Sequence, residues 1–111
     1  MNRFAASALV AVLAGAICAP TQAAVSEYTL TIRDHRFTPS ELTIPANTKV
    51  KLLVVNEDAT PEEFESHQLN REKVVTGNAT ISVYVGPLKP GRYTFFGDFH
   101  QDTAQGVLVV Q

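Results

Sequence analysis

Apolar residues alternate with polar ones in several short runs of this chain, and this pattern restricts the fold more than any other feature. Tyr28, Leu30 and Ile32 are each separated by one polar residue, which is the period of a half-buried β-strand. Similar short runs follow at 42–44, 49–55, 80–85, 92–96 and 106–110. Clusters of proline and glycine lie between them, most densely at 86–91. The pattern predicts an all-β sandwich of about seven to eight strands.

The stretch 60–75 permits two interpretations. Thr60, Pro61 and Glu63 form a helix-start signal, with a cap, a first-turn proline and a capping-box glutamate. The apolar residues that follow do not fall at helical spacing. We therefore expect an extended segment, with a short helix as the alternative.

The N-terminal segment has the layout of a secretory signal. Arg3 supplies the positive charge, residues 4–19 are apolar and uncharged, and Thr21-Gln22-Ala23 fits a small-residue cleavage site. We expect residues 1–23 to be removed and residues 24–111 to form one domain. After this segment no apolar run is long enough for a membrane-spanning helix, so none is expected in the mature chain.

Sulfur is confined to the same segment. The only cysteine is Cys18 and the only methionine is Met1. A mature domain without sulfur has no disulfides, thiolate catalysis, thiolate zinc sites or thioether ligands. Cys18 as a lipoprotein attachment site is the alternative, although Ile17 before it is not the small residue that such a site requires.

The charge of the chain excludes further partners. Without Arg3, eight basic residues stand against eleven acidic ones, and no basic patch is present for nucleic acid or anionic lipid. Five acids fall within nine residues, and we call them the acidic loop: Glu57, Asp58, Glu62, Glu63 and Glu65. With the segment 97–102, which carries Asp98 and His100, this loop holds most of the reactive groups. Carboxylates and imidazole without sulfur suit cations such as Cu(II), Fe(III), Fe(II) or Mn(II).

The C-terminal part, residues 91–100 and 104–110, resembles the last two strands of a cupredoxin. In that family a Tyr-x-Phe strand leads to Cys-x-x-His and then to a methionine. His100 retains the histidine position, whereas Gly97 stands at the position of the copper-binding cysteine and Ala104 near that of the axial methionine. The resemblance implies a Greek-key β-sandwich.

Upstream, Asn56-x-Asp58-x-x-Pro61 resembles the cupredoxin stretch that delivers the other histidine ligand, but Glu62 occupies that position. A blue-copper electron carrier requires the thiolate. The resemblance therefore implies a cupredoxin fold without a type 1 copper site.

Further motifs together resemble the EfeO-type cupredoxin-like domain over essentially the whole mature chain. They are Phe37-x-Pro39 and the stretches 61–66, 72–75, 86–96 and 98–100. This resemblance implies a periplasmic component of a bacterial ferrous-iron uptake system, which binds iron or copper or helps to oxidise iron before permeation. Its implied partners are an iron permease and a periplasmic metal-binding protein.

The expected metal ligands are Glu62, Asp98, His100 and Glu65. Glu62 and His100 take two ligand positions of the cupredoxin pattern, and Asp98 would share a strand face with His100 if the strand continues through them. Glu63 and Glu65 should point away from Glu62 in an extended segment, either as partners of surface lysines and arginines or as a second, outer metal patch. The weaker candidates are Glu72, read as a structural partner of Lys73, and the histidines His35 and His67.

Oxygen ligands stabilise Fe(III) more than Fe(II), so a cluster of Glu62, Asp98 and His100 would make bound ferrous iron easier to oxidise. The sequence leaves open whether turnover occurs. Two alternatives compete with this hypothesis. One is a metal-free sandwich that docks a transporter partner through the acidic loop, and the other is a periplasmic copper carrier.

Overall fold

The structure is a computed structural model that describes residues 10, 11, 15 and 25–111. Apart from those three residues, the predicted signal segment 1–23 lies outside the described residues, as does Cys18. Within the described part of the chain, no helix is long and apolar enough to cross a membrane.

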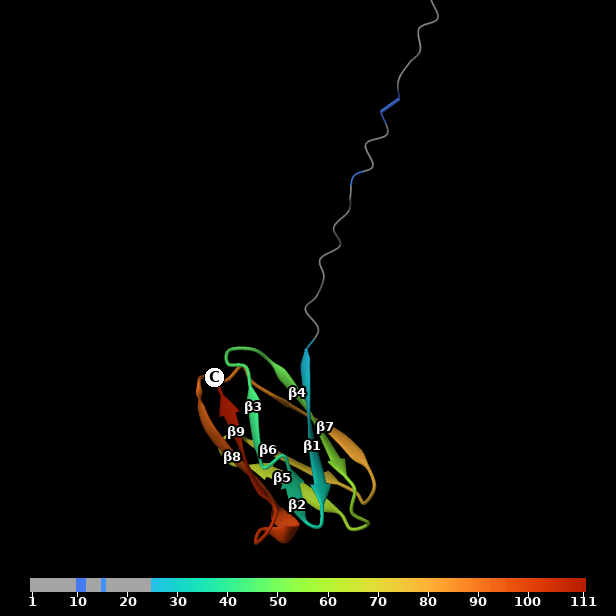
Figure 1. Cartoon of the computed structure of the whole chain (residues 1–111), viewed down its shortest axis with the longest axis vertical. Coiled ribbons are helices and arrows are strands. Elements are labelled where there is room, and N and C mark those ends of the chain that lie inside the picture. Colours follow the sequence, from blue (N-terminus) through green and yellow to red (C-terminus); the bar gives the residue numbers. More distant parts are fainter. Residues whose placement is uncertain (1–9, 12–14, 16–24) are drawn as a thin grey trace, which may run out of the picture.

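Residues 25–111 fold into a sandwich of two β-sheets (Figure 1). One sheet has the strand order β2-β1-β4-β7 and the other has the order β3-β9-β8-β5-β6. The strands are β1 (Ser26–Arg33), β2 (Arg36–Thr38), β3 (Glu41–Ile44), β4 (Val50–Asn56), β5 (Glu62–Ser66), β6 (Arg71–Val75), β7 (Thr80–Val85), β8 (Gly91–Gly97) and β9 (Gln105–Val110). One turn of 3-10 helix, η1 (Asp98–His100), follows β8.

Both sheets are mixed. β1 pairs with β4 in parallel and β3 pairs with β9 in parallel, while the other neighbours are antiparallel. Parallel neighbours cannot be joined by a tight hairpin, so the chain crosses between the sheets. The predicted all-β sandwich is confirmed. The nine strands of the described residues exceed the expected number because of the short strand β2 and the separate strands β5 and β6.

The core lies between the sheets and follows the alternation seen in the sequence. On β4, for example, Val50, Leu52 and Val54 are fully buried, whereas the residues between them are partly exposed. Three phenylalanines meet at the centre: the ring of Phe95 lies 4.9 Å from that of Phe37, edge to face, and 5.4 Å from that of Phe64. Such aromatic contacts add stabilisation beyond the buried area.

The stretch 60–75 is extended, as expected. It forms the hairpin of β5 and β6, in which Glu65 lies opposite Glu72. On β5 the buried residues are Glu62, Phe64 and Ser66. Two of these three are polar, which explains why this strand lacked an apolar alternation.

The open side of the sandwich lies between the edge strands β6 and β7. Arg71 Nε donates to the carbonyl oxygen of Tyr84 at 2.8 Å, and Lys73 Nζ donates to that of Ser82 at 3.1 Å. Charged side chains on an edge strand protect it against pairing with another chain. Here they also join the two sheets.

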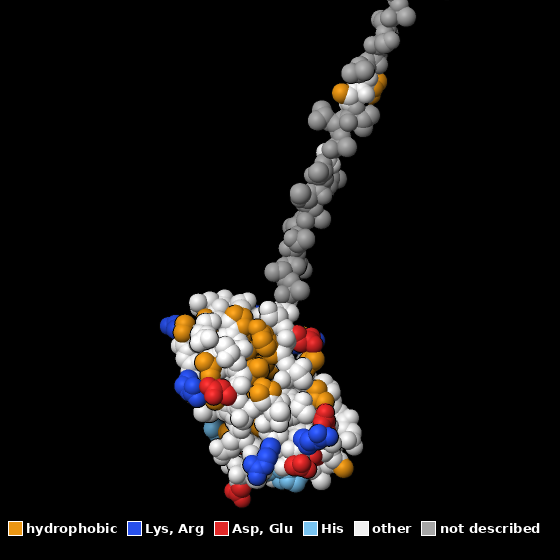
Figure 2. Space-filling model, viewed as in Figure 1, with side chains coloured by type: hydrophobic (Ala, Val, Ile, Leu, Met, Phe, Trp, Pro, Cys, Tyr) orange, Lys and Arg blue, Asp and Glu red, His pale blue; other side chains and the backbone are white. Residues whose placement is uncertain are grey.

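One end of the sandwich brings together η1 and the turn between β1 and β2 (Figure 1). The Thr103 hydroxyl donates to the carbonyl oxygen of His35 at 2.6 Å, which links the two segments. In the same view, Figure 2 shows acidic, basic and histidine side chains gathered at this end.

Candidate metal centre

Glu62 begins strand β5 and points into the sandwich, where it is 1 % exposed. Its Oε1 accepts hydrogen bonds from the backbone N–H of Phe99 at 2.8 Å and of Glu63 at 3.0 Å. Its Oε2 lies 2.6 Å from Nδ1 of His100. These bonds compensate the burial of the carboxylate, and they fix η1 against the start of β5.

Gly97 leaves the space that the Glu62 carboxylate occupies. A Cβ atom on residue 97 would lie 2.6 Å from Cδ of Glu62 and 2.7 Å from Cβ of Ala104. The four positions that the cupredoxin resemblance aligns with copper ligands, 62, 97, 100 and 104, therefore meet in space. The Glu62 carboxylate fills the space into which a side chain on residue 97 would extend.

His35 covers the outer side of this pair. Its ring stacks on that of His100, with the centroids 3.5 Å apart and the planes 12° from parallel. His35 Nε2 lies 3.3 Å from the Thr60 hydroxyl. Both histidines therefore direct one nitrogen toward the segment that enters β5.

The turn that carries His35 is held by Asp58. Asp34 and His35 both have positive φ, 51° and 56°, and their backbone N–H groups donate to the two carboxylate oxygens of Asp58 at 2.9 and 3.0 Å. The hydrogen bond from His35 is the main reason that the pKa of Asp58 lies below its ordinary value, and the bond from Asp34 adds to it. An ionised Asp58 thus stabilises the turn.

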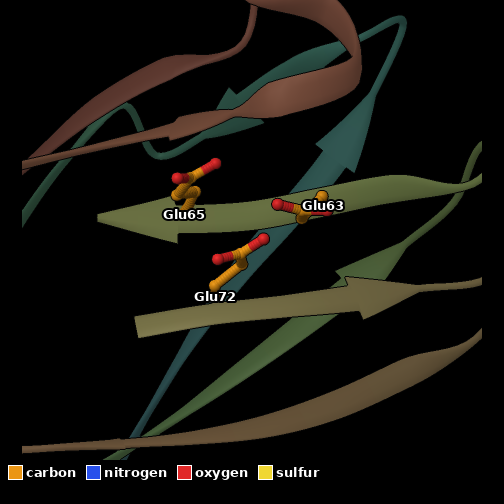
Figure 3. A group of neighbouring side chains, drawn as sticks. All are labelled: Glu63, Glu65 and Glu72. Carbon is orange, nitrogen blue, oxygen red and sulfur yellow. The ribbon is translucent and has the colours of Figure 1, made fainter. Parts of the chain in front are cut away.

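A second group of donors, which we call the carboxylate cluster, lies on the outer face of the β5–β6 hairpin (Figure 3). Glu63 and Glu65 extend from β5 and Glu72 from β6, and one carboxylate oxygen of each lies within 4.8 Å of the others. A side-chain hydrogen bond with Glu72, together with desolvation and the neighbouring negative charges, raises the pKa of Glu63 to about 7.

The structure separates the predicted ligands into two groups. Glu62 and His100 lie together inside the sandwich, whereas Glu65 belongs to the carboxylate cluster. Asp98 does not share a strand face with His100, because β8 ends at Gly97 and both residues lie on η1. Asp98 Oδ1 accepts a hydrogen bond from the Gln101 side chain at 2.7 Å, and its charge also raises the pKa of Glu63.

Two residues that are weaker candidates in the sequence, Glu72 and His35, lie beside predicted ligands in the structure. Glu72 reaches Glu63 and Glu65 because of the hairpin register. His35 reaches His100 because the β1–β2 turn lies next to η1. In the sequence, the polar pair Asp34-His35 between two strands was the available signal for that turn.

Residues 5–110 match the cupredoxin-like domain family. The chain belongs to this family. A relative of this cupredoxin-like domain is the uncharacterized protein RP394 of Rickettsia prowazekii (strain Madrid E), which is 51% identical over 86 residues, or 78% of this chain and 69% of the relative.

Solved structures share the fold of this cupredoxin-like domain. Auracyanin A, a blue copper protein from Chloroflexus aurantiacus, has a TM-score of 0.67 at 17% identity, over 79% of this chain and 100% of that chain. The metal-binding domain of the Cu(I)-exporting P-type ATPase CopA of Streptococcus pneumoniae D39 has a TM-score of 0.66 at 9% identity, over 77% of this chain and 84% of that chain. Both of these similar structures are of copper-binding proteins.

Proposed function

We propose that this domain binds an iron or copper ion through the carboxylate cluster, as a periplasmic component of a bacterial ferrous-iron uptake system. The observation that carries the proposal is the gathering of Glu63, Glu65 and Glu72, with ligand oxygens within 4.8 Å of one another. Three carboxylates that approach from two paired strands supply oxygen ligands, and oxygen ligands suit hard cations.

Repulsion among the three carboxylates destabilises the hairpin, and a bound cation would remove this repulsion. Glu65 stands directly opposite Glu72 in the hairpin, and like charges at such a cross-strand position destabilise a sheet. The raised pKa of Glu63 has a related origin: the protonated group hydrogen-bonds to Glu72, and desolvation and the negative charge of Glu72 add to the shift. A bound metal ion would neutralise these carboxylates and relieve the repulsion.

The role in iron uptake rests on the resemblance of the mature chain to EfeO-type domains and on the secretory features of its N-terminal segment. The proposed partners are an iron permease and a periplasmic metal-binding protein. Because carboxylate oxygens stabilise Fe(III) more than Fe(II), binding here would make the iron easier to oxidise by an external electron acceptor before its permeation.

Metal titration tests the proposal. Fe(II) under nitrogen and Cu(II) would be added separately to the wild type and to a Glu63→Gln/Glu65→Gln/Glu72→Gln variant, and binding followed by calorimetry. We expect the variant to lose tenfold or more in affinity for iron, since ligand loss typically costs at least about tenfold. A charge-matched control, Glu27→Gln/Glu41→Gln/Glu57→Gln, removes three surface acids from other strands and loops and should bind as the wild type does. Equal affinity for iron in all three proteins would contradict the assignment.

In the docking alternative, only some members of the acidic loop are exposed enough to contact a partner. Asp58 is engaged with the β1–β2 turn and Glu62 is buried, so Glu57, Glu63 and Glu65 are the members with exposed or partly exposed side chains. A metal-free docking domain would bind no stoichiometric metal in the same titration. The alternative of a copper carrier would bind Cu(II) in that titration, but with different partners.

A further inference from the structure

We infer that His35 and His100 form a second metal site, made for a cation that prefers imidazole, with Cu(II) as the expected occupant. The two rings stack at 3.5 Å, and His100 contacts Glu62, which points inward from β5. The carboxylate cluster lies on the outer face of that strand. This site is separate from the carboxylate cluster, and it does not depend on metal binding there.

The orientation of His100 is that of a prepared ligand. The buried Glu62 carboxylate holds Nδ1 at 2.6 Å, which leaves Nε2 as the nitrogen available for a metal. Metal-binding histidines usually donate their other N–H to a carboxylate or carbonyl in this way, which fixes the ring and raises its basicity. Glu62, enclosed by its own hydrogen bonds and by Gly97, serves here as a positioning residue.

His35 has a backbone conformation that is uncommon for residues other than glycine. Its φ of 56° follows the φ of 51° at Asp34, and two successive positive values at a two-residue hairpin turn favour asparagine and glycine. Residues held in such conformations against their preference cluster at functional sites. Asp58 holds this turn through both backbone N–H groups, so the backbone that carries the His35 ring stays beside η1.

An open hollow at this end of the sandwich supplies room and further donors. His35 and His100 line it together with Asp98 and Asp102. His35 directs Nε2 toward Thr60, so its Nδ1, like Nε2 of His100, is the nitrogen left for an ion. Two imidazole nitrogens with carboxylate or water ligands suit Cu(II).

The lone pair of an imidazole nitrogen lies in the plane of its ring. Two rings 12° from parallel must therefore splay apart before they share one ion. Binding should accordingly abolish the stacking, and a diamagnetic stand-in such as Zn(II) would make this visible. In NMR spectra, the ring protons of both histidines would lose the upfield shift that a stacked neighbour imposes.

The test uses the mature domain with the carboxylate cluster removed by Glu63→Gln/Glu65→Gln/Glu72→Gln. Cu(II) binding is followed by affinity and by electron paramagnetic resonance. We expect one Cu(II) with hyperfine coupling to two nitrogens. His35→Gly should remove one nitrogen and lower the affinity by about tenfold or more. Glycine is suited to a positive φ, so this variant should remain folded. His67→Ala changes the remaining histidine of the domain and serves as the matched control.

Three results would overturn the inference. They are an oxygen-only spectrum in the starting protein, an unchanged two-nitrogen spectrum in His35→Gly, and loss of a nitrogen in His67→Ala. Iron binding by the otherwise unchanged domain is measured separately. Failure of the carboxylate cluster to bind iron would contradict the proposed function and leave the histidine result intact.

Discussion

The Glu62 carboxylate occupies the space that a side chain on Gly97 would need: a Cβ on residue 97 would lie 2.6 Å from Cδ of Glu62. We expect Gly97→Ala to lower the free energy of unfolding by about 1–3 kcal/mol, as overpacking of a filled interior does. Urea denaturation measures the change. Gly91→Ala is the control, because a Cβ there would meet its nearest neighbour, the Tyr93 ring, at an ordinary 3.5 Å.

The Glu62→Ala background tests whether the Glu62 carboxylate causes the loss of stability in Gly97→Ala. Removal of the carboxylate frees part of the space, so Gly97→Ala should cost at least about 0.5 kcal/mol less in this background than in the wild type. The contact with Ala104 remains in both backgrounds. A strictly additive double variant would contradict the view that residues 62 and 97 are coupled.

The stability of the metal-free domain should fall between pH 4.5 and about 7. The neighbouring Glu72 raises the pKa of Glu63 from 4.5 to about 7. The folded state therefore holds a proton that the unfolded chain has released, and this stabilisation is lost as the pH rises through that interval. In the presence of a chelator, Glu63→Gln should flatten this part of the stability profile. A decline of the same size in Glu63→Gln would show that other groups cause it.

Asp58 should have the opposite pH dependence at lower pH. Hydrogen bonds from the backbone N–H groups of His35 and Asp34 lower its pKa below 3.8. Its contribution is therefore present above that value and is lost as the pH falls through the still lower folded pKa. Asp58→Asn should remove this acid-dependent loss and cost about 1 kcal/mol at neutral pH, a discounted value because the site is partly exposed. Thermal unfolding between about pH 2 and 7 tests both expectations, and an unchanged acid-dependent loss in Asp58→Asn would contradict this role of Asp58.

Arg71 and Lys73 should keep the domain from associating through its β6 and β7 edges. Their side chains donate to the carbonyl oxygens of Tyr84 and Ser82. Loss of both cations in Arg71→Ala/Lys73→Ala would expose these acceptors to another strand. We expect concentration-dependent oligomers in size-exclusion chromatography with light scattering.

The matched control for this edge is Arg33→Ala/Lys89→Ala, which removes one arginine and one lysine from exposed positions elsewhere. It should elute as the wild type does. A monomeric edge variant, or equal association of the control, would contradict the protective role of Arg71 and Lys73.

The sandwich could be predicted because a strand with one buried face shows alternating apolar and polar residues, as β1 does at Leu30 and Ile32. The sequence did not reveal β5 as a separate strand, since the inward positions there are Glu62 and Ser66 beside Phe64. These polar residues are stable inside only because η1 and β8 supply their hydrogen bonds. That compensation comes from distant segments and is invisible in a local pattern.

The candidate site divides in the same way. The pairing of Glu62 with His100 followed from the cupredoxin resemblance, which encodes long-range position. The approach of Glu72 to Glu63 depends on the register of a hairpin, and the stacking of His35 on His100 depends on contact between two loops. Neither contact can be inferred from residue spacing, so Glu72 and His35 are only weak candidates in the sequence.

The length of the loop before strand β5 decides which side chains of that strand face the core. Successive side chains of the strand face opposite sides, with Glu62 inward toward His100 and Glu63 outward beside Glu72. Insertion or deletion of one residue in the segment 57–61 would exchange the two faces if the strand slipped in its pairing. The imidazole would lose its partner and the cluster would lose a member in one event. Natural or engineered variation in this loop should therefore conserve its length and Asp58 more strictly than its other residues.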